Sequence, residues 1–202
     1  MKKIKKSSEE EMVLEFLKME LQSDRFSSKI LKILKNLKLD IDIINNGNLL
    51  NDNENRLRSV VLGQFRGYKL NKELFKNYPN KIKWYWVLLD EQDLEKIRYI
   101  NYSYWNELSN FTNSPLEAAK TIFSGKEIYG VSNKGFLEAS DYLKDGGIFP
   151  PLIMITDMNE TKYVILEGHK RLTAYALSPE YFKNVSVLLG YCSTENFANW
   201  NN

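Results

Sequence analysis

One short segment combines a turn glycine with consecutive basic side chains, and chemistry is expected there first. The sequence Glu-Gly-His-Lys-Arg at 167–171 follows an apolar run at 163–166 and opens a helical pattern at 169–177. The first amide N–H groups of a helix have no internal partner, and the peptide dipoles make that end positive. A helix start beside basic side chains is therefore suited to bind phosphate. We expect a phosphate or nucleotide pocket at 167–171, the alternative being basic residues that are simply solvated.

Each side chain of this motif has an expected role. Gly168 lets phosphate approach the backbone closely, and Lys170 and Arg171 neutralise its oxygens, Arg171 as a bidentate fork. His169 donates a hydrogen bond to the phosphate and is, with Glu167, a candidate catalytic residue. Glu167 could act as general base on an acceptor hydroxyl, or help to hold Mg²⁺. The alternative for Glu167 is structural, a carboxylate that caps the motif helix.

The motif and its flanks resemble the signature of the ParB/sulfiredoxin superfamily. In that group a strand leads to a glycine-containing turn, and a His/Arg-Arg pair then opens a helix rich in small residues. The resemblance covers about residues 120–193. Four segments around the motif fit the pattern: Val-Ile-Leu at 164–166, Leu-Thr-Ala-Tyr-Ala at 172–176, the proline-led 149–155 and the apolar 185–189.

Members of this superfamily differ in function, and the sequence differs from the patterns of two of its groups, the sulfiredoxins and the partition-type ParB proteins. Sulfiredoxins carry a catalytic cysteine where His169 stands, whereas the only cysteine, Cys192, follows the last expected strand. Partition-type ParB proteins bind CTP through Gly-Glu-Arg-Arg and carry a helix-turn-helix domain downstream, for which residues 172–202 are too few. Relatives with an Asp/Glu-Gly-His-x-Arg pattern include nucleotide-dependent small-molecule kinases and nucleases. The resemblance thus implies a nucleotide (ATP, ADP or CTP), with Mg²⁺ as a companion, more firmly than any one reaction.

Three functions stay open at this point. The first is a nucleotide-binding protein that acts as a phosphotransferase or nucleotide hydrolase on an unknown small-molecule partner. The second is a non-catalytic module that senses a nucleotide and contacts a protein partner or DNA. The third is a ParB-like nuclease, which needs paired acidic metal ligands, and the carboxylates at 141, 145, 157 and 160 make no recognisable metal spacing. The nuclease ranks last.

Composition excludes several classes. With 28 Lys+Arg against 26 Asp+Glu the formal charge is only +2, so any DNA binding is expected to be weak and without sequence preference. One cysteine forms no internal disulfide, and one histidine with one cysteine cannot supply a Cys/His zinc site, so no metal site is predicted. No apolar run reaches the roughly 18–20 residues of a membrane span, and the basic N-terminus lacks the apolar region of a signal peptide. A cytoplasmic location is expected.

Apolar periodicity predicts an α+β fold, with a mainly helical N-terminal part at 1–112 and a ParB/sulfiredoxin-like mixed α/β unit at 113–202. Residues 1–7 read as a disordered tail, and Ser8 as the cap of a first helix. Further helices are expected after Ser27 or Ser28 and at about 54–65, 91–100, 115–123 and 133–144. Strands are expected at about 81–89, 127–130, 152–156, 162–166 and 185–189.

The N-terminal part is expected to close over the motif and complete the site. Its candidates are Arg66 and the aromatic cluster at 99–105, with Trp105 or Tyr102 as a surface on which a base could stack. If so, one of these three side chains lines the cavity that contains His169. The alternative is that the aromatic residues form a separate core and that Arg66 lies on the surface. The lysines at 29, 32, 35 and 38 are read as a solvated helix face.

Overall fold

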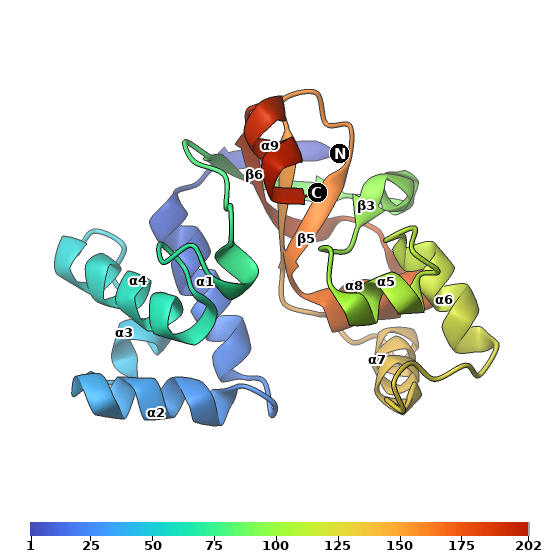
Figure 1. Cartoon of the computed structure of the whole chain (residues 1–202), viewed down its shortest axis with the longest axis horizontal. Coiled ribbons are helices and arrows are strands. Elements are labelled where there is room, and N and C mark those ends of the chain that lie inside the picture. The colour runs from blue at the N-terminus through green and yellow to red at the C-terminus, as the bar shows by residue number, and fades with distance from the viewer. Residues whose placement is uncertain (202) are drawn as a thin grey trace. The chain divides into compact units, whose positions relative to one another are not determined.

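The computed structural model describes residues 1–201 and shows an α+β protein (Figure 1). The chain forms two compact units. We call Ser7–Trp84 the helical unit, and Met1–Lys6 together with the chain from Tyr85 onward the sheet unit. The division falls at 84/85, inside a strand, rather than at the expected 112/113. The reason is that the segment from Tyr85 to the aromatic cluster supplies strands and core residues to the sheet unit.

A mixed sheet with the strand order β1-β2-β6-β4-β5-β3 forms the centre of the sheet unit. β4 is parallel to β6 and antiparallel to β5, and β3 runs parallel to β5. All residues of β4 are buried, as expected for a central strand with both faces covered. The strands are Lys2–Lys6 (β1), Lys83–Leu89 (β2), Ile97–Arg98 (β3), Leu152–Asp157 (β4), Tyr163–Glu167 (β5) and Val185–Cys192 (β6).

Within the sheet unit, α6, α7 and η3 pack against α8, the helix that carries the motif. Figure 1 shows β5 leading directly into α8, and α8 packs against both α6 and α7. α9 packs against β4. The bounds are Glu91–Lys96 (η2, a 3₁₀ helix), Ser103–Leu108 (α5), Pro115–Phe123 (α6), Lys134–Lys144 (α7), His169–Leu177 (α8), Pro179–Tyr181 (η3, 3₁₀) and Thr194–Asn201 (α9).

The helical unit packs α1 against α2 and α4 around its own apolar core. Ser8 caps α1 by accepting a hydrogen bond from the Glu11 amide, as the sequence predicts, and Gly67 ends α4 in the left-handed conformation. The guanidinium of Arg58 is fully buried and donates to the carbonyls of Ile43 and Asn48, which ties the segment 43–48 to α4. The elements are Glu9–Leu21 (α1), Ser27–Leu37 (α2), Asp42–Asn45 (α3), Asp52–Arg66 (α4) and Glu73–Phe75 (η1, 3₁₀).

Three local predictions are wrong. Residues 2–6 are not a tail but the edge strand β1, which pairs antiparallel with β2. The expected helix at 91–100 ends at Lys96, because the next two residues pair with β5. The segment 127–130 forms only an isolated bridge between Ile128 and Val131.

No helix within residues 1–201 combines the length and the apolar character that crossing a membrane requires.

Strand β1 yields a direct prediction. All five of its side chains are exposed, and backbone pairing with β2 holds it in place together with Lys3 and Lys5, whose ammonium groups lie over aromatic rings of the sheet unit. The amides of 2–6 that donate to β2 should therefore exchange with solvent more slowly than those of a synthetic peptide of residues 1–8, measured by hydrogen exchange. Equal exchange rates in the protein and the peptide would show that the segment is a disordered tail and not a paired strand.

Candidate functional site

The motif begins where β5 turns into α8, and Gly168 makes the turn possible. Its backbone has φ 103° and ψ 25°, in the left-handed region that side chains disfavour. A Cβ built on Gly168 would lie 2.5 Å from Cδ2 of Leu152 and 3.0 Å from Nη2 of Arg171. Leu152 is fully buried and cannot move aside freely. Glycine is therefore required here by both conformation and space.

Glu167 and Arg171, on either side of this turn, hold each other. Nη2 of Arg171 donates to Oε2 of Glu167, and Nη1 donates to the Pro150 carbonyl at 3.2 Å. Both side chains of the pair are only 14% exposed. The sequence predicted Arg171 as a phosphate fork and Glu167 as a base or a helix cap. In the structure the two side chains form an ion pair that fastens the end of β5 to the first turn of α8, and the roles in phosphate binding and catalysis stay predictions.

His169 lies in an aromatic cluster with Trp105 and Tyr99. The imidazole stacks on Trp105 with ring centroids 5.0 Å apart, and the Tyr99 ring lies 4.6 Å from Trp105 and 6.1 Å from His169. Trp105 also meets the rings of Tyr104 and Phe136 edge-on. The structure thus brings together two residues that the sequence proposed for one site. Trp105 is half-buried, so much of its ring serves packing, and its role in binding a ligand stays a prediction.

A buried chain of hydrogen bonds, from Tyr99 through Thr173 to His169, fixes the first turn of α8. The Thr173 hydroxyl donates to the His169 carbonyl at 2.8 Å, one helical turn earlier. The same hydroxyl lies 2.7 Å from the Tyr99 hydroxyl, which must then be the donor to Thr173. Burial raises the pKa of Tyr99 above its ordinary value, although the bond to Thr173 acts in the opposite direction. Tyr99 therefore stays protonated and remains a donor at physiological pH.

The exposed Lys170 links the motif to a second helix start. A Cβ on Gly135, in the first turn of α7, would lie 3.4 Å from the Lys170 ammonium nitrogen, so this side chain lies against that turn. Neither α7 nor α8 has an acidic residue in its first turn or a side chain that caps it. α1 and α4 have both. Two positive helix ends thus meet near Lys170 and the exposed Lys134.

Two other residues that the sequence proposes for the site have different surroundings. Arg66 belongs to the helical unit, where it pairs with Glu20 at 2.6 Å and lies over the Phe26 and Phe65 rings. Tyr102 precedes α5 and is 43% exposed. A role for either residue in ligand binding stays a prediction.

Cys192 is buried at the end of β6, and its thiol contacts the Thr156 carbonyl at 3.6 Å. Along β4, Asp157 pairs with Cys192 while Ile153 pairs with Glu167. Four residues of strand separate these points by about 13 Å. Burial also raises the pKa of the thiol to about 11. The thiol is therefore remote from the motif and protonated at neutral pH.

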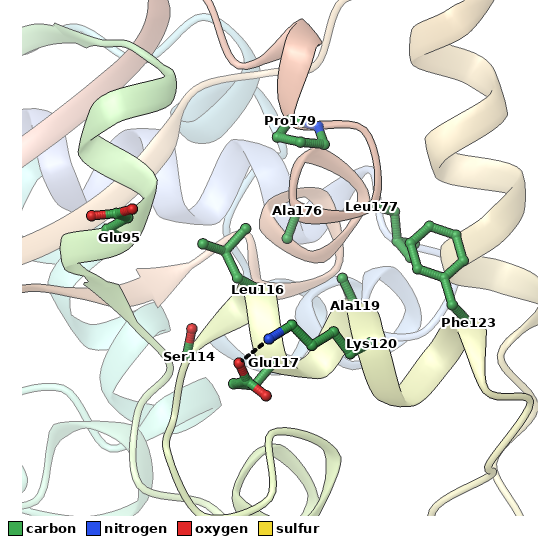
Figure 2. Close-up of a pocket in the computed structure, with 10 residues that line it drawn as sticks. All are labelled: Glu95, Ser114, Leu116, Glu117, Ala119, Lys120, Phe123, Ala176, Leu177 and Pro179. Carbon is green, nitrogen blue, oxygen red and sulfur yellow. Dashed lines mark hydrogen bonds and ion pairs between the residues drawn. The ribbon is translucent and has the colours of Figure 1, made fainter.

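Two further observations complete the description. Within residues 1–201, no group of three or more His, Cys, Asp or Glu side chains is arranged to hold a metal ion. A cavity of about 490 Å³ lies at the other end of α8, lined partly by Ala176 and Leu177, and Gly168 to Arg171 take no part in it (Figure 2). The motif is the better candidate for anion binding than this cavity, because the basic side chains and the positive helix starts lie at the motif.

Comparison with protein-family models, curated proteins and solved structures finds no match for this chain. The likeness to the ParB/sulfiredoxin superfamily therefore rests on the short motif and its flanking segments alone. What the site can do must be argued from its geometry.

The hydrogen-bond chain under α8 predicts the effect of one deleted oxygen. Tyr99→Phe removes the donor to Thr173 and should lower the free energy of unfolding by about 1–2 kcal/mol, measured by urea denaturation. Tyr129→Phe is the matched control, since the Tyr129 side chain is 67% exposed, and its effect should stay within about 0.5 kcal/mol. Equal stabilities for the two variants would show that the buried chain contributes nothing.

Proposed function

We propose that this protein binds a nucleotide through its phosphate groups, between the first turns of α7 and α8. The observation that carries the proposal is the meeting of two uncapped helix starts at Lys170. Each start carries a partial positive charge, and a cation held against one is unfavourable by about 0.3–1 kcal/mol. Lys170 adds to that positive field, and so in part does Lys134, which also pairs with Glu138 at 3.6 Å. An anion placed between the helices would relieve this repulsion and accept hydrogen bonds from amide N–H groups.

The aromatic cluster supports a nucleotide over a simple anion. Trp105 and His169 lie at the same helix start as the proposed phosphate site, and Trp105 is not fully buried. A base could stack against this cluster while its phosphates reach the amides. ATP, ADP and CTP are the ligands to test, with and without Mg²⁺. Glu167 is the carboxylate of the motif that could help to hold the Mg²⁺.

The ion pair between Glu167 and Arg171 favours binding without catalysis. A general base needs a free carboxylate, and here the carboxylate is held by a guanidinium in a largely buried pair. Phosphotransfer or hydrolysis would require phosphate to draw Arg171 away from Glu167. ³¹P NMR of the nucleotide during incubation separates these functions: unchanged nucleotide fits the proposal, and new phosphate signals that vanish in Glu167→Gln would establish catalysis.

A cytoplasmic location is part of the proposal. The single cysteine is a buried free thiol, which suits a reducing compartment where nucleotides are abundant.

Thermal-shift measurements with Lys170→Ala test the proposal. Binding to the folded state alone stabilises it by about 2.7 kcal/mol when the ligand is at 100 times Kd. Wild-type protein should therefore melt at a higher temperature with ADP, ATP or CTP, and the variant should bind about tenfold more weakly. Without ligand, Lys170→Ala should melt no lower than wild type, because the lost cation opposed two helix dipoles.

Lys126→Ala is the matched control, since Lys126 is exposed and lies outside the motif. It should leave the nucleotide shift intact. The proposal fails if no nucleotide raises the melting temperature, or if Lys170→Ala and Lys126→Ala respond alike.

A further inference from the structure

The cavity at the far end of α8 is a second concave feature, and the proposed nucleotide site does not use it. Residues of η2, α6, the last turn of α8 and the start of η3 line this open cavity (Figure 2). Its volume of about 490 Å³ lies within the roughly 300–1,000 Å³ typical of small-molecule sites. Its wall residues on α8, Ala176 and Leu177, lie about 12 Å from the helix start, so the two sites are separate.

The walls of this groove are mainly apolar. Two small side chains, Ala119 on α6 and Ala176 on α8, line it where the two helices pack. Phe123 lies at the rim and is 67% exposed, so a large ring faces water in the empty groove. An apolar ligand that covers this ring would remove its apolar surface from water, which favours binding. Leu116, Leu177 and Pro179 complete the apolar lining.

The charges of the lining leave one carboxylate uncompensated. Glu117 and Lys120 form an ion pair at 2.6 Å and cancel each other. Glu95 makes no ion pair within residues 1–201. The guanidinium of the neighbouring Arg98 donates instead to the backbone carbonyls of Glu95 and Ile97. The lining therefore carries a net charge of about −1, located on Glu95.

Figure 2 shows Glu95 and Phe123 at opposite ends of this lining, with Leu116 and Ala119 between them. We propose that the groove binds a small molecule with one cationic amine and an apolar body. The ammonium group pairs with Glu95, and the apolar body lies along α6 and ends against Phe123. A single unpaired carboxylate favours a ligand with one positive charge. An anion is disfavoured because the lysine of the lining, Lys120, is already paired with Glu117.

The test uses 4-phenylbutylamine as the probe and its neutral alcohol, 4-phenylbutanol, as the comparison. ¹H–¹⁵N NMR titration of the full chain should shift the amides of 114–123 and 176–179 with the amine, and more weakly with the alcohol. Glu95→Gln should weaken amine binding about two- to fivefold, the size expected for an exposed ion pair. Phe123→Ala should weaken both ligands, because it removes the apolar end of the groove.

Matched controls exist for both substitutions. Glu91→Gln changes an exposed carboxylate on the same 3₁₀ helix, and Phe111→Ala removes a ring that is 71% exposed outside the groove. Neither control should change amine binding. Lys170→Ala should not change it either, because the amine site does not depend on the nucleotide site. The inference is overturned if the amine shifts other residues, if Glu95→Gln and Glu91→Gln act alike, or if the alcohol binds as tightly. Self-association abolished by Phe123→Ala would assign the groove to a second copy of the chain and would also contradict it.

Discussion

The first turn of α8 is held by a hydrogen-bond chain that leaves little freedom. The hydroxyl of Tyr99 donates to Thr173, and Thr173 donates to the carbonyl of His169. Because both hydroxyls are fully buried, breaking either bond would leave a polar group without water to replace its partner. This chain sets the position of His169, and with it the stack on Trp105. The direction in which the first amides of α8 point follows from the same constraint.

Around that fixed turn the charges are arranged in two different ways. Glu167 and Arg171 neutralise each other and join the end of β5 to α8. Lys170 has no such partner role and lies instead against the start of α7, where the dipole of that helix opposes it. The ion pair joins two elements of the structure, whereas the positive field near Lys170 is the part of the motif that we propose receives the phosphate. In this proposal the charged residues of one motif are divided between support and recognition.

Local patterns in the sequence predict much of this region, and tertiary partners supply the rest. The apolar run at 163–166, the turn at Gly168 and the helix at 169–177 follow from residue types over a few positions, and the structure confirms them. The hydrogen bond between Tyr99 and Thr173 joins residues 74 positions apart. The helical pattern around Thr173 does not indicate this partner. β1 reads as a charged tail because its strand character comes from pairing with β2 and not from its side chains. The short strand β3 replaces a helix for the same reason.

The central claim is that the starts of α7 and α8 together bind phosphate, and backbone amides report on this most directly. In a ¹H–¹⁵N NMR titration with ADP, the amides of 134–135 and 169–171 should shift together and saturate at one Kd. Pyrophosphate should shift the same amides, and adenosine, which has no phosphate, should shift them much less than ADP does. If ADP leaves these amides unchanged, or if adenosine shifts them as much as ADP does, the account of this site is wrong.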